Sequence, residues 1–275
     1  MGKTENKSRK GLKLFLALGG IVTAMLSPGG GQANERHFTY AYESGVLPKG
    51  GKELELWVSP RIGRRDFYSR FDLRAEFEVG LTDRLQTALY LNSRSITEED
   101  GQGDSKTEFE FTGVSSEWKL KLFDPVADAL GFALYGEITG STDELEVEGK
   151  LIADKRIGPW LLAANLVAEQ EWEFGPGETE REMAAEAALG LGYFLTLNLS
   201  IGIELRNHNA FSEGEDWEYS ALFLGPVLSY AEEGWWAALS FMPQLPALKG
   251  AKPGDSRILD EQEKINARLL FAFHL

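Results

Sequence analysis

The chain ends in a segment whose apolar and polar side chains alternate up to the C-terminal residue itself. Its apolar face consists of Ile265, Ala267, Leu269, Phe271, Phe273 and Leu275, and its polar face includes Lys264, Asn266, Arg268 and His274. Soluble domains usually fray at their termini, so an apolar strand face that continues to the last residue indicates a sheet closed by its own final strand. Such an arrangement is typical of an outer-membrane β-barrel.

The first residues have the composition of a secretory signal. Basic residues precede an apolar run from Leu14 to Leu26, and glycines follow it. The run is shorter than the roughly 20 residues that a membrane-spanning helix needs. We therefore expect residues 1–33 to be a signal peptide that is cleaved after Ala33, with a cut after Ala24 as the alternative.

The charge of the remaining chain limits its partners. Loss of residues 1–33 would leave 23 basic and 42 acidic residues, which argues against nucleic acid as a partner. There are no cysteines, so disulfides and thiolate metal sites are excluded, and we expect no cofactor. The length suits one domain. We predict an N-terminal periplasmic or lumenal segment over 34–51 and a barrel over 52–275.

Alternation recurs through the predicted barrel and is less regular over 106–122 and 217–231. It is clearest from Tyr68 to Leu81, which is longer than the 5 or so residues typical of soluble strands and fits a tilted transmembrane strand of about 9–11 residues or more. The predicted strands are 52–63, 68–81, 84–95, 106–122, 129–140, 143–155, 159–174, 180–193, 196–208, 217–231, 234–244 and 262–275. In 106–122 the apolar phase changes, which predicts a β-bulge near Gly113. The fold class is therefore all-β, a single transmembrane antiparallel up-and-down barrel of about 12 strands.

The predicted connections are of two kinds that alternate along the chain. Short turns are expected at 82–84, 123–125, 156–158, 194–195 and 232–234. The other connections are 64–67, 96–105, 141–143, 175–179, 209–216 and 245–261. Because membrane barrels have short periplasmic turns, both termini should lie on the periplasmic side.

A soluble β-sandwich or a lipocalin-like barrel would also show alternation, but with its apolar side chains inside. The strand lengths, the apparent signal peptide and the apolar C-terminal strand argue against it. About 12 strands also make a barrel too wide for aliphatic side chains to fill as a dry core.

Three segments carry a resemblance to known proteins. They are Leu47-Pro48-Lys49-Gly50, Gly80-Leu81-Thr82-Asp83-Arg84-Leu85-Gln86 and the closing Leu269-Leu270-Phe271-Ala272-Phe273-His274-Leu275. Together they resemble a group of uncharacterised Gram-negative outer-membrane barrels over essentially all of the mature chain. The last segment is similar to the signal read by the barrel-assembly machinery, which the resemblance implies as a partner during biogenesis, although Leu275 stands where an aromatic residue is usual.

The polar faces of the strands are the candidate lining of a pore. The predicted pore-lining residues are Asp72, Arg74, Glu76, Glu78, Arg94, Glu108, Glu110, Glu146, Glu148, Glu169, Glu171, Glu182, Glu186, Glu204, Arg206 and Arg268. Acids gather near the predicted outer loops, as over 92–112 and 169–186, which predicts an electronegative outer half. Two interpretations remain open: an ion-paired, solvated lumen, or an acidic vestibule that concentrates cations. Carboxylates could bind divalent cations, but no fixed metal-binding spacing is present.

Aromatic residues have two expected roles. Trp118, Trp160, Trp172, Tyr193, Trp235 and Trp236 lie near predicted strand ends, as expected of an interfacial girdle. Phe38, Tyr40 and Tyr42 precede the first strand and could form either a periplasmic latch or a plug in the lumen.

The histidines give little support for catalysis. His208 lies near Asn209 and Ser212, but the His-x-Ser spacing of an outer-membrane phospholipase is absent, because Ala210 occupies the serine position. His37 and His274 lie near the ends of the mature chain. We therefore expect that the protein is not an enzyme.

These observations predict a passive pore in the lipid of the outer membrane, with a preference for cations among small solutes. Two alternatives remain: a structural or binding barrel occluded by side chains or by residues 34–50, and a lipid-modifying enzyme.

Overall fold

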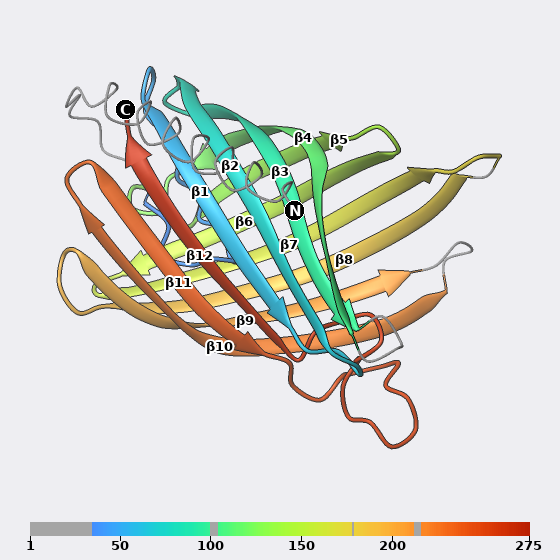
Figure 1. The fold of residues 1–275 in the computed structure, drawn as a ribbon. Helices are drawn as coiled ribbons and strands as arrows, with labels where there is room; N and C mark the ends of the chain where they lie inside the picture. Colours follow the sequence, from blue (N-terminus) through green and yellow to red (C-terminus); the bar gives the residue numbers. More distant parts are fainter. Residues whose placement is uncertain (1–34, 100–103, 178, 212–215) are drawn as a thin grey trace, which may run out of the picture.

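The computed structural model describes residues 35–99, 104–177, 179–211 and 216–275, and these form a closed barrel of twelve antiparallel strands (Figure 1). The strands are β1 (Lys52–Ile62), β2 (Tyr68–Thr82), β3 (Leu85–Glu99), β4 (Ser105–Phe123), β5 (Gly131–Gly140), β6 (Glu144–Ile157), β7 (Trp160–Phe174), β8 (Thr179–Phe194), β9 (Leu199–Phe211), β10 (Trp217–Glu232), β11 (Trp235–Pro243) and β12 (Ile265–His274). Each strand pairs with its neighbours in the sequence, and β12 pairs with β1. The predicted fold class and strand number are confirmed.

The last strand closes the barrel as its alternation predicts. In the register between β1 and β12, Leu56 is opposite Phe271 and Glu53 is opposite His274, so apolar and polar positions match across the seam. No sheet edge is left open in this part of the ring, and closure removes the unpaired backbone groups that a membrane would not tolerate.

The two faces of the strands have opposite character. On the outer face Leu89 and Leu166 are 59% and 61% exposed, whereas on the inner face Glu55 and Glu204 are 1% and 0% exposed. Aliphatic side chains therefore face outward and carboxylates face inward, which is the reverse of a soluble barrel. The soluble alternative is excluded by this arrangement.

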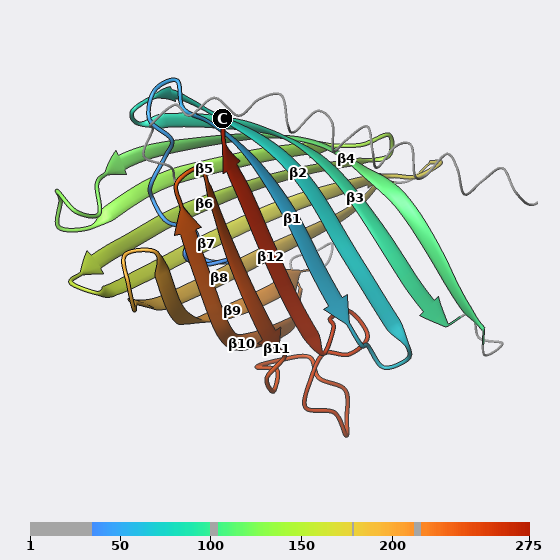
Figure 2. The same cartoon turned by 60° about the vertical axis from the view of Figure 1, so that its left-hand side comes forward.

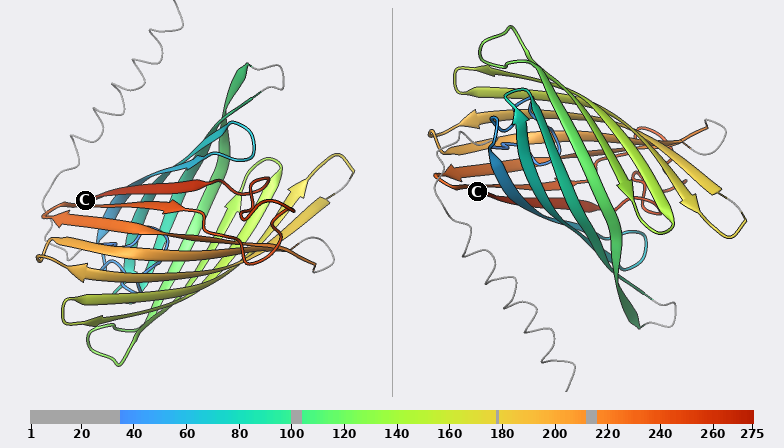
Figure 3. Two further views of the ribbon diagram at one scale, coloured as in Figure 1. Left: turned by 90° about the horizontal axis from the view of Figure 1, so that it is seen from below. Right: turned by 90° about the horizontal axis from the view of Figure 1, so that it is seen from above.

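The two ends of the barrel differ. The C-terminus and the short connections lie at one end, called the turn end here, and the loop end is opposite (Figure 1). The turn between β4 and β5 covers residues 124–130 and is longer than predicted. At the loop end the long strands β3, β4, β7 and β8 extend past the rest of the barrel (Figure 3), as does the loop over 244–264.

The predicted bulge is present in β4. Asn92 pairs with Gly113 and the next residue, Ser93, pairs with Phe111, so Thr112 is the extra residue. Gly113 has φ of 127°, a conformation that residues with a side chain rarely adopt. The bulge explains the change of apolar phase within this strand.

Residues 35–49 form no strand and run inside the ring, where Figure 2 shows the dark blue segment passing behind β10. Within the described ranges, no helix is both long enough and apolar enough to cross a membrane. The predicted signal peptide over 1–33 lies outside the described residues.

Candidate functional site

The candidate site is the lumen, and its turn half is occupied by residues 35–49, called the lumenal segment here. The segment contacts Phe194 near the turn end through His37, reaches the middle of the lumen, and returns to the turn end at Lys49. Of the latch and the plug that the sequence left open, the plug is the observed arrangement.

A single carboxylate on β9 holds the part of the lumenal segment that reaches the middle of the lumen. The backbone N–H groups of Thr39, Tyr40 and Ala41 all donate to Oε1 of Glu204, at 3.0, 2.8 and 2.9 Å. The Thr39 hydroxyl donates to Oε2 of the same carboxylate at 3.0 Å and lies 2.5 Å from the Ser240 hydroxyl. Consecutive N–H groups that converge on one anion form a concave binding site for it. Glu204 therefore fixes the turn of the segment at mid-lumen.

Three polar side chains on other strands fix the descending part of the segment. Asn165 on β7 accepts from the Tyr42 N–H at 2.5 Å and donates to its carbonyl at 3.0 Å. Asp154 on β6 accepts from the N–H of Ser44, and Gln86 on β3 accepts from that of Leu47. Because these strands lie on different sides of the ring, the segment spans the lumen.

Apolar contacts complete this attachment. Phe38, Tyr40 and Tyr42 each join a different buried cluster on the barrel wall. The wall provides room through small inward residues: Ala133, Ala163, Ala188, Ala221, Ala238 and Ala272. At Gly190 a Cβ atom would lie 2.8 Å from three atoms of the Phe38 ring, so only glycine leaves space for this ring.

An ion pair within the segment links its two arms. Nδ1 of His37 lies 3.0 Å from Oε2 of Glu43, and the His37 N–H donates to the same carboxylate. Burial alone would lower the pKa of His37, but the Glu43 carboxylate outweighs it and raises this pKa above 6.5. Burial would raise the pKa of Glu43, yet His37 holds it below 4.5. Both groups are therefore stabilised in their charged forms.

Buried carboxylates surround the segment in the turn half: Glu53, Glu55, Glu76, Glu78 and Glu117. Two overlapping triads among them have ligand atoms within 4.8 Å of one another, as does the triad of Glu144, Glu146 and Glu171. Such groups could hold a hard divalent cation.

The expectation that Trp236 is a girdle residue is wrong. Its side chain points inward, is 1% exposed and donates to Glu53 at 3.0 Å.

The loop half of the lumen contains a cavity of about 510 Å³, called the chamber here. Tyr40 and Tyr42 of the lumenal segment form part of its lining, and Glu261 and Gln262 contribute from the long loop at the loop end. The segment therefore separates the chamber from the turn end of the barrel.

Charges in the chamber are segregated by strand. Most of the arginines come from β12, β1, β2 and β3, and most of the glutamates come from β5 to β8 on the other side of the ring. Lys150 on β6 and Arg206 on β9 are the basic residues on the glutamate side. Eight basic and ten acidic side chains contribute to the lining. Ion pairs between lining residues include Arg74 with Glu137 at 3.2 Å, Lys150 with Glu148 at 2.7 Å, and Arg206 with Glu186 at 2.5 Å.

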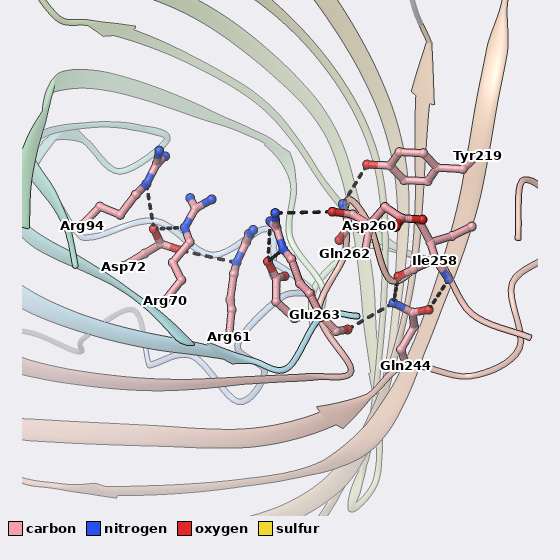
Figure 4. Close-up of polar contacts among 11 residues, drawn as sticks. Arg61, Arg70, Asp72, Arg94, Tyr219, Gln244, Ile258, Asp260, Gln262 and Glu263 are labelled. Carbon is pink, nitrogen blue, oxygen red and sulfur yellow. Dashed lines mark hydrogen bonds and ion pairs between the residues drawn. The ribbon is translucent and has the colours of Figure 1, made fainter. Parts of the chain in front are cut away.

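The loop over 244–264 is tied to the rim of the chamber (Figure 4). Arg64 donates to the fully buried Glu263 at 2.8 Å, and Gln262 donates to the Tyr219 hydroxyl. Gln244 accepts from the N–H of Ile258 at 2.7 Å, which fixes the fold of the loop itself. These contacts give the mouth a defined shape.

The predicted pore-lining residues fall into three groups. The chamber is lined by Asp72, Arg74, Arg94, Glu146, Glu148, Glu169, Glu171, Glu182, Glu186, Arg206 and Arg268. Glu76, Glu78 and Glu204 lie buried in the turn half instead. Glu108 and Glu110 are exposed and border a separate pocket at the loop end of β3 and β4. Arg70 was not among the predicted pore-lining residues. It lies two residues before Asp72 on β2, so the alternation of that strand predicts that it faces inward as Asp72 does.

His208 lies beside a charged pair on the wall of the chamber. Its Nδ1 lies 3.4 Å from Oε2 of Glu186, the same oxygen that binds Arg206, and its ring packs near Tyr219. Ser212 lies outside the described residues. The prediction that the protein is not an enzyme stays a prediction.

Comparison with solved structures supports the fold. The NanC porin is 9% identical, with a TM-score of 0.53, and the match covers 81% of this chain and 99% of that porin. The β domain of the autotransporter BrkA from Bordetella is 12% identical, with a TM-score of 0.50, and the match covers 82% of this chain and all of that domain. At such identities the likeness shows an outer-membrane barrel fold alone.

Sequence comparison gives a family without an assigned activity. The model of a family of unknown function, DUF6662, matches residues 31–157 and 143–275, which together include the whole barrel. No curated protein matches the chain.

Proposed function

The chain belongs to the DUF6662 family of unknown function, so its activity has to be inferred from the barrel, and we propose a plugged outer-membrane pore for small solutes. In this proposal residues 1–33 direct export, the barrel resides in outer-membrane lipid after insertion by the barrel-assembly machinery, and the chamber receives solutes through the loop end.

The lumenal segment is the observation that carries this proposal. It is held by side chains and not by strand pairing, and both its arms return to the turn end. A segment attached in this way can leave without breaking a strand of the ring. The route through the barrel is thus closed when the segment is bound and open when it is displaced.

A preference for cations is the finer part of the proposal. The excess of acids over bases in the chamber is small, but further acids such as Glu98, Glu99 and Glu110 lie at the loop ends of β3 and β4. Fixed negative charge at a mouth raises the local concentration of cations and lowers that of anions.

The test is conductance in planar lipid bilayers. We expect the native barrel to conduct little, and a variant that lacks residues 35–47 to conduct steadily with a reversal potential of the cation-selective sign. Glu233→Gln, which changes an exposed carboxylate at the turn end, is the matched control and should behave as the native barrel does.

Two results would contradict parts of the proposal. Anion selectivity of the deletion variant would exclude the cation preference. If the deletion variant folds but stays silent, the barrel is not a pore, and the occluded binding barrel becomes the better account.

A further inference from the structure

We propose that the chamber binds a small zwitterionic solute, whose carboxylate is held by Arg61, Arg70 and Arg94 and whose ammonium group is held by the glutamates of β6 and β7. This inference rests on the proposed function only in that the solute enters from the loop end, and it names the class of solute.

On the arginine side of this site, three guanidinium groups form ion pairs with the same carboxylate. Asp72 is approached by Nε of Arg70 at 2.7 Å, of Arg61 at 3.3 Å and of Arg94 at 3.4 Å (Figure 4). One carboxylate therefore serves three guanidinium groups. In the described part of the chain, no hydrogen bond reaches the terminal nitrogens of these three side chains.

Those terminal nitrogens are suited to a carboxylate. A guanidinium presents paired N–H donors in a planar fork, which matches the two oxygens of a carboxylate. All three arginines line the chamber and are partly exposed within it, at 22%, 18% and 30% for the side chains of Arg61, Arg70 and Arg94. A solute in the chamber can therefore reach them.

The glutamate side carries the complementary charge. Glu144, Glu146 and Glu171 have carboxylate oxygens within 4.8 Å of one another, and no ion pair to these three is found in the described residues. All three line the chamber. An ammonium group offers three donors, so it can contact several of these oxygens at once.

The rest of the chamber explains why the solute should carry both charges. The charged pairs Arg74 with Glu137 and Lys150 with Glu148 already satisfy each other. What remains is an excess of positive charge on β1–β3 and of negative charge on β6 and β7. A simple anion would meet repulsion from one wall and a simple cation from the other, whereas a zwitterion is attracted by both.

Isothermal titration calorimetry of the folded full barrel in detergent tests this inference without any need for conductance. The probes are ω-amino acids from glycine to 6-aminohexanoate, with butanoate and butylammonium as single-charge controls. We expect one chain length to bind best and to bind about tenfold or more tightly than either control at low salt.

Two variants separate the two walls. Arg70→Met should reduce binding of the best zwitterion about tenfold, and so should Glu146→Gln. Arg70→Met relieves repulsion among three arginines, so the barrel should fold as well as the native one does. Arg181→Met removes an exposed positive charge from β8 outside the chamber and should leave binding unchanged.

Equal binding of butanoate and the zwitterions would overturn the proposal in favour of a simple anion site, and so would unchanged binding in folded Arg70→Met. Conductance without binding would reject this inference alone. Binding without conductance would reject the pore and leave the solute site in place.

Discussion

The turn half and the loop half of the lumen are built from the same twelve strands, yet one is filled and the other is hollow. In the turn half, the carboxylate of Glu204 is satisfied by N–H groups of the lumenal segment. In the loop half, Asp72 is surrounded by arginines that keep free donors. Alternation therefore fixes which side chains face inward, but it does not fix what they bind.

Glu204→Ala should have the largest effect on the attachment of the lumenal segment in the turn half. The substitution removes the acceptor of three buried N–H groups, and each such donor left unpaired costs about 1–3 kcal/mol. The segment should therefore leave its site, and trypsin should cleave rapidly after Arg36, which is 7% exposed in the native barrel. Glu204→Gln keeps one acceptor oxygen, so it should protect Arg36 from trypsin better than Glu204→Ala does. If trypsin cleaves after Arg36 no faster in Glu204→Ala than in the native barrel, Glu204 does not hold the segment in place.

A smaller effect is expected where the wall makes room for the segment. Gly190→Ala places a Cβ against the Phe38 ring, and overpacking of this kind costs about 1–3 kcal/mol. Cleavage after Arg36 should become faster, but less so than in Glu204→Ala. Gly136→Ala is the matched control, because its Cβ would meet only a backbone oxygen at 3.9 Å. Similar cleavage rates in the two glycine variants would show that Phe38 does not depend on this space.

The strands were predictable from sequence because lipid outside and water inside impose a period of two on every one of them. The place of the lumenal segment was left open between a latch and a plug, because residues 35–49 have no period and their partners lie on strands far away in sequence. One signal was present: small residues such as Ala188, Gly190 and Ala272 occupy inward positions where charged side chains are the rule. Small inward residues on several strands indicate that something else fills the space.

The chamber shows the same division. In an up-and-down barrel, strands that are neighbours in sequence are neighbours in space, so arginines over 61–94 and glutamates over 137–186 predict two walls of opposite charge. What could not be predicted is the sharing of Asp72 among three arginines. It depends on side-chain conformations across β1, β2 and β3 that alternation leaves open.

Attachment of the lumenal segment should depend on pH through the ion pair between His37 and Glu43. Because the pKa of His37 is raised, the stability that His37 gives to the bound segment is complete below pH 6.5. This stability is lost as the pH rises through the raised pKa. Because the pKa of Glu43 is lowered, the stability that Glu43 gives to the bound segment is complete above pH 4.5. This stability is lost only as the pH falls through the lowered pKa. The segment should therefore be held most tightly between these two pH values and loosen in alkali.

Proteinase K cleavage within residues 35–49, normalised to the denatured chain and followed from about pH 6 to 9, measures this loosening. His37→Gln should remove most of the change over that range. If His37→Gln loosens in alkali as much as the native barrel does, another group is responsible.

The smallest effect is expected at the exposed end of the loop half. Arg65 lies 2.6 Å from Asp255 and 3.0 Å from Asp260, and its hydrogen bond lowers the pKa of Asp260 to about 2. The pair is thus charged at all ordinary pH values, but exposed ion pairs contribute little and are screened by salt. Arg65→Gln should leave the thermal unfolding of the barrel and the protease resistance of residues 244–264 nearly unchanged.

Arg64→Gln provides the contrast one residue away. Its partner Glu263 is fully buried, so the substitution leaves a carboxylate without its counter-ion in a place that water does not reach. The loop over 244–264 should then be cleaved readily, whereas in Arg65→Gln it stays intact. Equal protease sensitivity of the two variants would mean that burial of Glu263 is not what holds the loop on the mouth of the chamber.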